Sequence, residues 1–99
     1  MIKRRNEMKI RVRAFGDLMA LLGKESTVEL SDEARFKHLV STLTEKTGSA
    51  KKGFLGRYDV TGPNLVMLLN GRNIHALEKI ETALKDGDVV TLLPPVVGG

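Results

Sequence analysis

The residues of this chain that could take part in chemistry lie at its end, in the segment Pro94-Pro95-Val96-Val97-Gly98-Gly99. Two closing glycines contribute no side-chain packing and carry the largest backbone entropy of any residue type. Such an end does little for a fold, but it suits a chain end that another protein must grip. We therefore expect Gly99 to be the functional end of the chain, although an ordinary frayed terminus can have the same composition.

The composition of this tail favours insertion into a narrow channel of a partner. Fully extended, residues 94–99 reach about 20 Å, enough to cross a deep active-site channel while the folded part stays outside. The Pro94-Pro95 pair stiffens the base of the tail and reduces the entropy lost on insertion. Val96, Val97 and Gly98 complete the inserted segment, and glycine lets the walls of the channel come close to the backbone.

The side chains offer little chemistry of their own. The 99 residues include no cysteine, so the chain has no thiol nucleophile, no cysteine–metal site and no side-chain thioester. The two histidines, His38 and His75, are distant in sequence, and we expect neither to bind a metal. The carboxyl group of Gly99 is then the natural group to activate, and we expect no catalytic residue in this chain.

The segments before the tail predict the strands of one sheet. Met8, Ile10, Val12 and Ala14 alternate with charged residues, which is the pattern of a half-buried strand. Further strands are expected at residues 26–30, 65–69, 72–75 and 89–93. Asn70-Gly71 predicts a tight hairpin turn, and residues 85–88 predict another turn before the last strand.

Two helices are expected between these strands. Asp17 would cap a short helix whose buried side holds Leu18, Leu21 and Leu22, and Gly23 would end it. The main helix would begin at Ser31 or Asp32, end at Gly48, and bury the stripe of Phe36, Leu39, Val40 and Leu43. Residues 48–64 are rich in glycine and predict a long loop, part of which packs down through Phe54, Leu55 and Tyr58.

One amphipathic helix laid over one face of a mixed, four- or five-stranded sheet is an α+β grasp arrangement. We expect the last strand to lie centrally in this sheet, so that the tail leaves from a rigidly held point. The chain then divides into a flexible basic extension (residues 1–7), one folded domain (residues 8–95) and a protruding Gly-Gly tail (residues 96–99).

The net charge is +4, with a basic cluster in the extension and the first strand. Basic clusters can bind nucleic acid, but three phenylalanines and one tyrosine are few for a base-stacking platform. We favour a solvated extension that leads into a strand with an exposed basic face. No apolar run is long enough to span a membrane and no signal peptide is recognisable, so we expect a cytoplasmic protein without a membrane partner.

Four segments, in this order, resemble the MoaD/ThiS family of ubiquitin-like sulfur carriers, which includes the archaeal small modifier proteins. They are residues 15–23, Asn70-Gly71, residues 84–90 and residues 94–99. The MoaD branch is the closer one, because of the Pro-Pro pair and the short helix. The extension and the loop at residues 51–64 depart from the compact MoaD pattern. The resemblance implies a β-grasp, ubiquitin-like fold over about residues 8–99.

The resemblance also implies what happens at Gly99. A ubiquitin-activating-type enzyme would use ATP to convert the carboxylate to an acyl-adenylate, and sulfur would then replace one oxygen to give a thiocarboxylate. The protein would be a carrier or co-substrate and not an enzyme, with no bound cofactor. It would serve as the small subunit of molybdopterin synthase, with a MoaE-like large subunit, in molybdenum cofactor biosynthesis.

Two alternatives stay open. Gly99 would instead be joined to lysines of target proteins, as in a ubiquitin-like modifier, and the two roles do not exclude each other. A nucleic-acid-binding module of similar fold is the less favoured alternative, prompted by the basic first strand.

A docking surface is expected beside the tail. If Ile10 and Val12 face the main helix, Phe15 points to the open face of the sheet. The resemblance implies that Leu93 shares that side, so that Phe15 and Leu93 belong to an apolar partner surface. From the sequence alone, Phe15 is rather a plug at the strand end.

Overall fold

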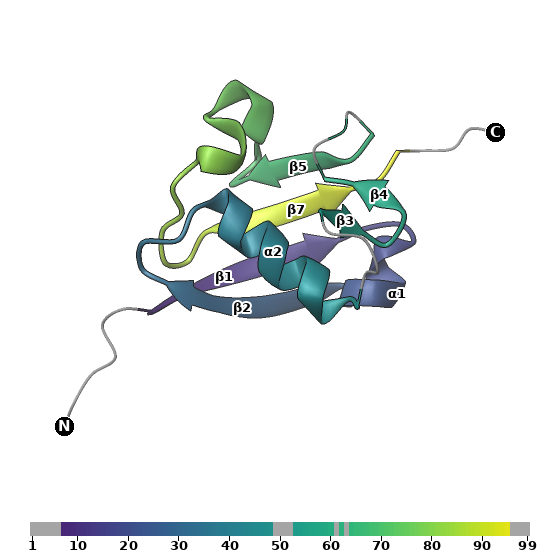
Figure 1. The fold of residues 1–99 in the computed structure, drawn as a ribbon, viewed down its shortest axis with the longest axis horizontal. Coiled ribbons are helices and arrows are strands. Elements are labelled where there is room, and N and C mark those ends of the chain that lie inside the picture. The colour runs from purple at the N-terminus through teal and green to yellow at the C-terminus, as the bar shows by residue number, and fades with distance from the viewer. Residues whose placement is uncertain (1–6, 49–52, 61, 63, 96–99) are drawn as a thin grey trace.

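The protein folds as one mixed sheet covered by one main helix (Figure 1). The computed structural model describes residues 7–48, 53–60, 62 and 64–95. The five strands of the sheet lie in the order β2 (Glu25–Ser31), β1 (Glu7–Ala14), β7 (Val89–Leu93), β5 (Val66–Leu69) and β6 (Arg72–Asn73). Only the β1–β7 pair is parallel among these neighbours. The predicted α+β, β-grasp fold is confirmed, and so is the central position of the last strand.

Strand β1 follows the predicted alternation. Met8, Ile10, Val12 and Ala14 are buried in the core, and the residues between them are exposed on the other face. The main helix α2 (Phe36–Lys46) covers the core side of the sheet (Figure 1). Its predicted stripe is confirmed, because the core includes Phe36, Leu39, Val40 and Leu43.

The predicted start of α2 at Ser31 or Asp32 is wrong, because the helix begins at Phe36 with Arg35 as its N-cap. The Ala34 N–H first closes a turn onto the Ser31 carbonyl at 3.0 Å. The backbone around Arg35 then pairs with a distant segment, since the Phe36 N–H donates to the Thr82 carbonyl at 2.8 Å. At the other end Gly48, at φ +68°, follows the helix as expected.

The short helix α1 (Leu18–Leu22) forms where it was predicted and ends at Gly23. Its predicted details are partly wrong, since Leu18 is buried but Leu21 is 45% exposed. Asp17 stands at the N-cap position without a capping hydrogen bond from its side chain. The Asp17 carboxylate instead accepts a bifurcated hydrogen bond from the Tyr58 hydroxyl, whose oxygen lies 2.8 and 2.9 Å from the two carboxylate oxygens.

Tyr58 belongs to a hairpin that the sequence did not predict. Within the expected 48–64 loop, β3 (Phe54–Leu55) pairs with β4 (Tyr58–Asp59) as a separate two-stranded sheet. Leu55 and Tyr58 are buried and Phe54 is half-buried, so the predicted packing of the loop is confirmed. The neighbouring Arg57 donates to the Tyr58 hydroxyl, and this hydrogen bond, with the charges of Tyr58 and Asp17, raises the pKa of Arg57.

The predicted fourth strand is shorter than expected. β6 ends at Asn73, whose side chain accepts a 2.9 Å hydrogen bond from the His75 N–H and so begins the 3-10 helix η1 (Ile74–Ala76). A second 3-10 helix, η2 (Lys79–Glu81), follows it. Ile74 is buried, so the chain turns back to the core where a longer strand would have stayed at the sheet edge.

Candidate functional site

The base of the tail is the end of the central strand. β7 pairs with β1 from Arg11↔Val89 to Ala14↔Leu92, and with β5 from Val66↔Leu93 to Leu69↔Val90. Its Val90 and Leu92 side chains are at most 1% exposed. A strand held on both edges and packed on one face is among the most rigid elements of a small domain. Pro94 follows it half-buried and Pro95 follows exposed.

Gly99 and the tail residues Val96, Val97 and Gly98 lie outside the described residues, as does most of the basic extension. Their roles therefore stay predictions. The structure does show where the tail begins, which is the end of β7 on the side of the domain that carries α1 and the β3–β4 hairpin (Figure 1).

The opposite end of β7 is fixed by the two turn motifs that stood out in the sequence. The Asp88 carboxylate, on a residue only 9% exposed, accepts hydrogen bonds from Asn70 Nδ2 at 3.0 Å and from the Lys85 N–H at 2.7 Å. Asn70 Oδ1 accepts from the Val89 N–H at 2.9 Å, and the Asn70 N–H donates to the Val89 carbonyl at 2.8 Å. The Asn-Gly and Lys-Asp-Gly-Asp turns thus form one bracket around the first residue of β7.

The same bracket holds β1. The Lys9 N–H donates to Asp86 Oδ1 at 2.8 Å, and the Lys9 carbonyl accepts from the Gly87 N–H at 2.9 Å. The Arg11 N–H donates to the Asp88 carbonyl at 2.9 Å. This explains in physical terms why the two turns occur together. They hold three strands in register, at the end of β7 that is away from the tail.

The open face of the sheet carries both predicted surface residues. Phe15 is 40% exposed and Leu93 is half-buried. The parallel register pairs Arg13 with Thr91, so Phe15 and Leu93 occupy the next pair of positions on the same face. The structure therefore brings Phe15 and Leu93 together on the side away from α2, and their contact with a partner stays a prediction.

Sequence reasoning missed the residues that complete this surface. Val66 pairs with Leu93 and Leu68 pairs with Thr91, and both β5 side chains are half-buried on the open face. All residues of the predicted strand at 65–69 are apolar, so the sequence alone does not show which of its side chains face the core. The register of β5 against β7 is the signal that separates the two sides. We call Phe15, Val66, Leu68 and Leu93 the open-face patch.

Positive charge borders the open-face patch. Lys9, Arg11 and Arg13 are exposed on the same face of β1. Arg11 Nε lies 2.9 Å from Glu25 Oε2, an exposed ion pair of the kind that adds little stability. The Arg13 guanidinium carbon lies 5.7 Å from the centre of the Phe15 ring, a cation–π contact that orients the ring. The arrangement suits an apolar partner surface with carboxylates at its margin.

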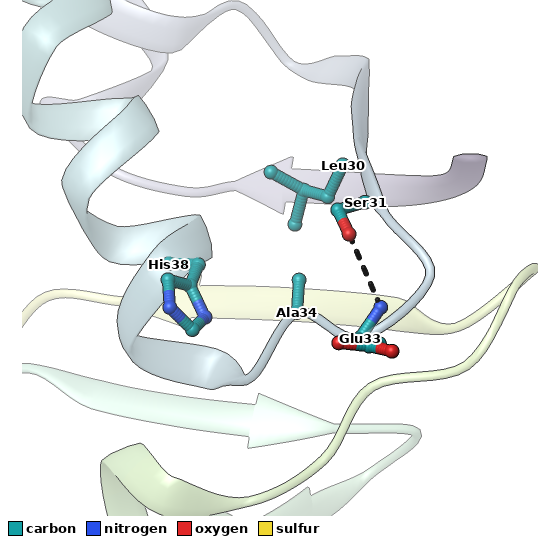
Figure 2. A pocket seen from close by; sticks show the side chains of 5 residues that line it. All are labelled: Leu30, Ser31, Glu33, Ala34 and His38. Carbon is teal, nitrogen blue, oxygen red and sulfur yellow. Dashed lines mark hydrogen bonds between the residues drawn. The ribbon is translucent and has the colours of Figure 1, made fainter. Parts of the chain in front are cut away.

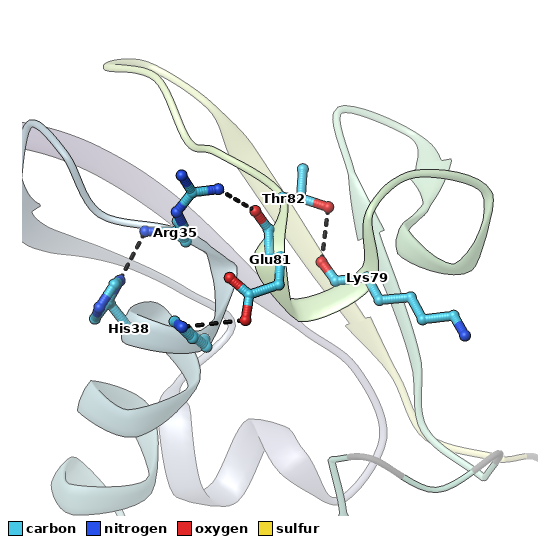
Figure 3. Close-up of polar contacts among 6 residues, drawn as sticks. Arg35, His38, Lys79, Glu81 and Thr82 are labelled. Carbon is cyan, nitrogen blue, oxygen red and sulfur yellow. Dashed lines mark hydrogen bonds and ion pairs between the residues drawn. The ribbon is translucent and has the colours of Figure 1, made fainter.

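Groups that could do chemistry by themselves are few. Within the described residues there is no cluster of three or more His, Asp or Glu side chains that could hold a metal ion. His38 Nδ1 accepts a 2.8 Å hydrogen bond from the Arg35 N–H, and the Arg35 guanidinium donates to the Glu81 carbonyl at 2.8 Å (Figure 3). His38 therefore has a structural role, in ordering the first turn of α2.

A pocket of about 430 Å³ lies between the end of β2 and the start of α2. Its lining includes Leu30, Ser31 and His38, with the Glu33 N–H donating to Ser31 Oγ at 3.3 Å (Figure 2). The antiparallel register of β2 with β1 puts this pocket at the far end of the sheet from Pro94. It is not part of the tail site.

In the part of the chain that the structure describes, no helix is long and apolar enough to cross a membrane.

Comparisons with known proteins agree with this geometry. The protein-family model described as the ThiS family matches residues 12–99 of this chain. Small archaeal modifier protein 3 of Haloferax volcanii is 31% identical over 96 residues, which cover 93% of this chain and 100% of that protein. The solution structure of small archaeal modifier protein 1 from Methanosarcina acetivorans is similar at a TM-score of 0.68 and 31% identity, covering 96% of this chain and 100% of that one.

A further similar structure is a complex of subunits 1 and 2 of the molybdopterin-converting factor from Helicobacter pylori 26695. Its matching chain is 32% identical, with a TM-score of 0.60, and the match covers 93% of this chain and 100% of that one. Together with the fold, these matches show that the chain belongs to the ThiS/MoaD family of ubiquitin-like sulfur carriers and modifiers, which are small carrier proteins and not enzymes.

Proposed function

We propose that the protein is a sulfur carrier whose Gly99 carboxyl group is adenylated and converted to a thiocarboxylate. In this role it acts as the small subunit of a molybdopterin synthase, with a MoaE-like large subunit, in molybdenum cofactor biosynthesis. The observation that supports the proposal most is that the Pro94–Pro95 base of the tail follows directly from the central strand β7. The similarity to a chain in the two-subunit complex from Helicobacter pylori favours this role.

The chemistry follows from the properties of a carboxylate. A free carboxylate is a poor electrophile, so Gly99 must first attack the α-phosphate of ATP, with pyrophosphate leaving and an acyl-adenylate forming. The terminal sulfur of a donor persulfide then adds to the acyl carbon and AMP leaves, which gives an acyl disulfide. A thiol reductant cleaves its S–S bond, releasing the thiocarboxylate and the donor as a thiol while the reductant is oxidised to a disulfide. ATP and the catalytic groups belong to the activating enzyme. This chain contributes a carboxyl end on a short tail with a fixed origin.

The open-face patch supplies the docking surface in this proposal. Phe15 and Leu93 lie next to the base of the tail, so a partner that covers them also has the tail within reach. The bordering Arg11 and Arg13 would be met by carboxylates of the partner. The activating enzyme and the large subunit would bind this face in turn, because each must receive the same tail.

Intact-mass measurement tests the proposal. Protein purified from its own cells, or incubated with its activating enzyme, ATP and a sulfur donor, should contain a fraction with the mass gain of one oxygen exchanged for sulfur. A variant that lacks Gly98 and Gly99 is the control and should show no such gain. The proposal is refuted if the full-length chain never acquires that mass under either condition.

A second candidate function is conjugation to lysines of other proteins, favoured by the 31% identity to small archaeal modifier protein 3 over nearly the whole chain. The sequence sets how this must be looked for. The last trypsin site is Lys85, so a digested conjugate carries residues 86–99 on the target lysine. A search for a two-residue Gly-Gly remnant would miss it. Absence of the long remnant, and of higher-mass species on blots against this chain, would exclude conjugation.

A further inference from the structure

We infer that Gly16 is a positioning residue for the tail, because it leaves the space into which the Pro94 ring packs and so sets the direction in which the chain leaves β7. The inference rests on the proposed function, since the direction matters only for a tail that enters an active site. It concerns a contact between the turn after β1 and the residue after β7, two points far apart in the sequence.

The geometry of the contact is close. A Cβ atom built on Gly16 would lie 2.8 Å from Pro94 Cγ, 3.7 Å from Pro94 Cδ and 4.0 Å from Pro94 Cβ. Gly16 also has φ +62°, a conformation that L-residues with a side chain rarely adopt. Two independent features therefore restrict this position to glycine, namely the positive φ and the closeness of the Pro94 ring.

The backbone of Gly16 has little freedom to move away. On one side, the Phe15 N–H donates to the Leu92 carbonyl at 3.2 Å and ties this turn to β7. On the other side, the Gly16 carbonyl accepts from the Met19 N–H at 3.1 Å, at the entry to α1. Leu18, in the first turn of α1, is fully buried. An added methyl group must therefore displace Pro94 more than it displaces the turn.

Pro94 cannot yield as a flexible side chain would. Its Cγ belongs to a ring closed on the backbone nitrogen, which also fixes φ. A change of ring pucker moves Cγ by a limited amount, and any larger displacement of the ring moves the main chain at the base of the tail. Carbon atoms in contact prefer separations of about 3.5–4.0 Å, so a methyl group at position 16 requires a shift of about 1 Å.

Such a shift is large on the scale of catalysis. Residues 95–99 reach about 15 Å when extended, so a change in direction at Pro94 grows toward Gly99. A misplacement of about 1 Å at a reacting group can lower the rate about 100-fold. We expect Gly16→Ala to lower kcat for adenylation of Gly99 about 10- to 100-fold. KM for the chain should change much less, because Val66, Leu68 and Leu93 of the open-face patch stay in place.

Gly48→Ala is the matched control. Gly48 has φ +68°, close to the φ of Gly16, and none of the described atoms lies within 4 Å of a Cβ built there. Both alanine variants carry the same kind of backbone strain, so Gly48→Ala measures the loss of thermal stability that this strain causes without the overlap with Pro94. Only Gly16→Ala should lose kcat, and this split separates positioning from a general loss of stability.

The contact itself is tested in a Pro94→Ala background. Alanine keeps Cβ, at 4.0 Å, and removes the two ring atoms that approach more closely. In this background, adding Gly16→Ala should lower kcat no more than about 3-fold, as expected where coupled residues no longer interact. If Gly16→Ala alone does not fold, the double variant must fold, because the overlap is gone.

The decisive assay is ATP–pyrophosphate exchange by the cognate activating enzyme, with full-length wild-type chain, Gly16→Ala, Gly48→Ala, Pro94→Ala and the double variant as substrates. Equal kcat for Gly16→Ala and Gly48→Ala would overturn the inference. An unchanged effect of Gly16→Ala in the Pro94→Ala background, or failure of both Gly16→Ala variants to fold, would also overturn it. Failure of the wild-type chain to be adenylated refutes instead the proposed function on which the inference rests.

Discussion

Replacing Asn70 by glycine should destabilise the protein strongly, because its side chain joins two strands at the start of β7. Asn70→Gly keeps the positive φ of 51° accessible and removes only the side-chain hydrogen bonds. Those are the bond from Asn70 Nδ2 to the buried Asp88 carboxylate and the bond from the Val89 N–H to Asn70 Oδ1. The Asp88 carboxylate then loses a hydrogen-bond donor at a buried position, and the Val89 N–H loses its side-chain acceptor at an exposed one.

The expected magnitude follows from these two bonds. A neutral hydrogen bond contributes about 1 kcal/mol and one to a charged group about 1.5–3 kcal/mol, so the loss is about 3 kcal/mol. For a domain of this size each 1 kcal/mol lowers Tm by about 4–8 °C, which predicts a fall of about 12–24 °C. Asn70→Ala should lose about 1 kcal/mol more, since alanine is strained at positive φ.

Asn73→Gly provides the matched control for this experiment. The Asn73 side chain accepts a hydrogen bond from the His75 N–H at 2.9 Å, with φ −64° and without a buried charged partner such as Asp88. Its loss should amount to about 0.5–1 kcal/mol. The assay is chemical denaturation with the midpoint and slope fitted together. If Asn70→Gly comes within about 1 kcal/mol of Asn73→Gly, the bracket around β7 does not have the energetic role assigned to it.

Three further predictions concern other parts of the molecule. Tyr58→Phe should lower the free energy of unfolding by about 1 kcal/mol, because it removes the hydrogen bond to the half-exposed Asp17 carboxylate. An unchanged Tm in thermal denaturation would contradict this. Phe15→Ala should raise KM for the activating enzyme about 10-fold with little change in Tm, and an unchanged KM would remove Phe15 from the docking surface. Deleting Gly98 and Gly99 should abolish adenylation and leave Tm unchanged, whereas salt-sensitive nucleic-acid binding that survived the deletion would favour the third alternative.

The long strands of the main sheet were predictable because their signal is local. The alternation of Met8, Ile10, Val12 and Ala14 identifies the buried face of β1 without reference to any other segment. The final strand and the Asn-Gly turn were equally plain, since a proline pair and a glycine with positive φ limit what the backbone can do.

What the sequence did not reveal depends on partners far along the chain. The start of α2 was misplaced because the backbone near Arg35 pairs with residues 82–84, and nothing local at Ser31 or Asp32 indicates this. Asp17 was taken for a helix cap, but the Tyr58 hydroxyl binds its carboxylate. Nothing local indicates a positioning role for Gly16, because the ring that occupies the space beside it belongs to Pro94.

The two ends of β7 are held by different kinds of interaction, and this difference separates stability from function. At its first residue, Asn70 and Asp88 form a polar bracket. Loss of this bracket should lower the free energy of unfolding but leave the direction of the tail unchanged in the molecules that stay folded. At its last residue, the Gly16–Pro94 contact is apolar and small, so disturbing it should redirect the tail at modest cost in stability. Variants at the first end should therefore change Tm and not kcat per folded molecule, and Gly16→Ala should lower kcat by more than its loss of Tm explains. A single correlation of kcat with Tm across both groups would mean that the tail depends only on how well the domain is folded.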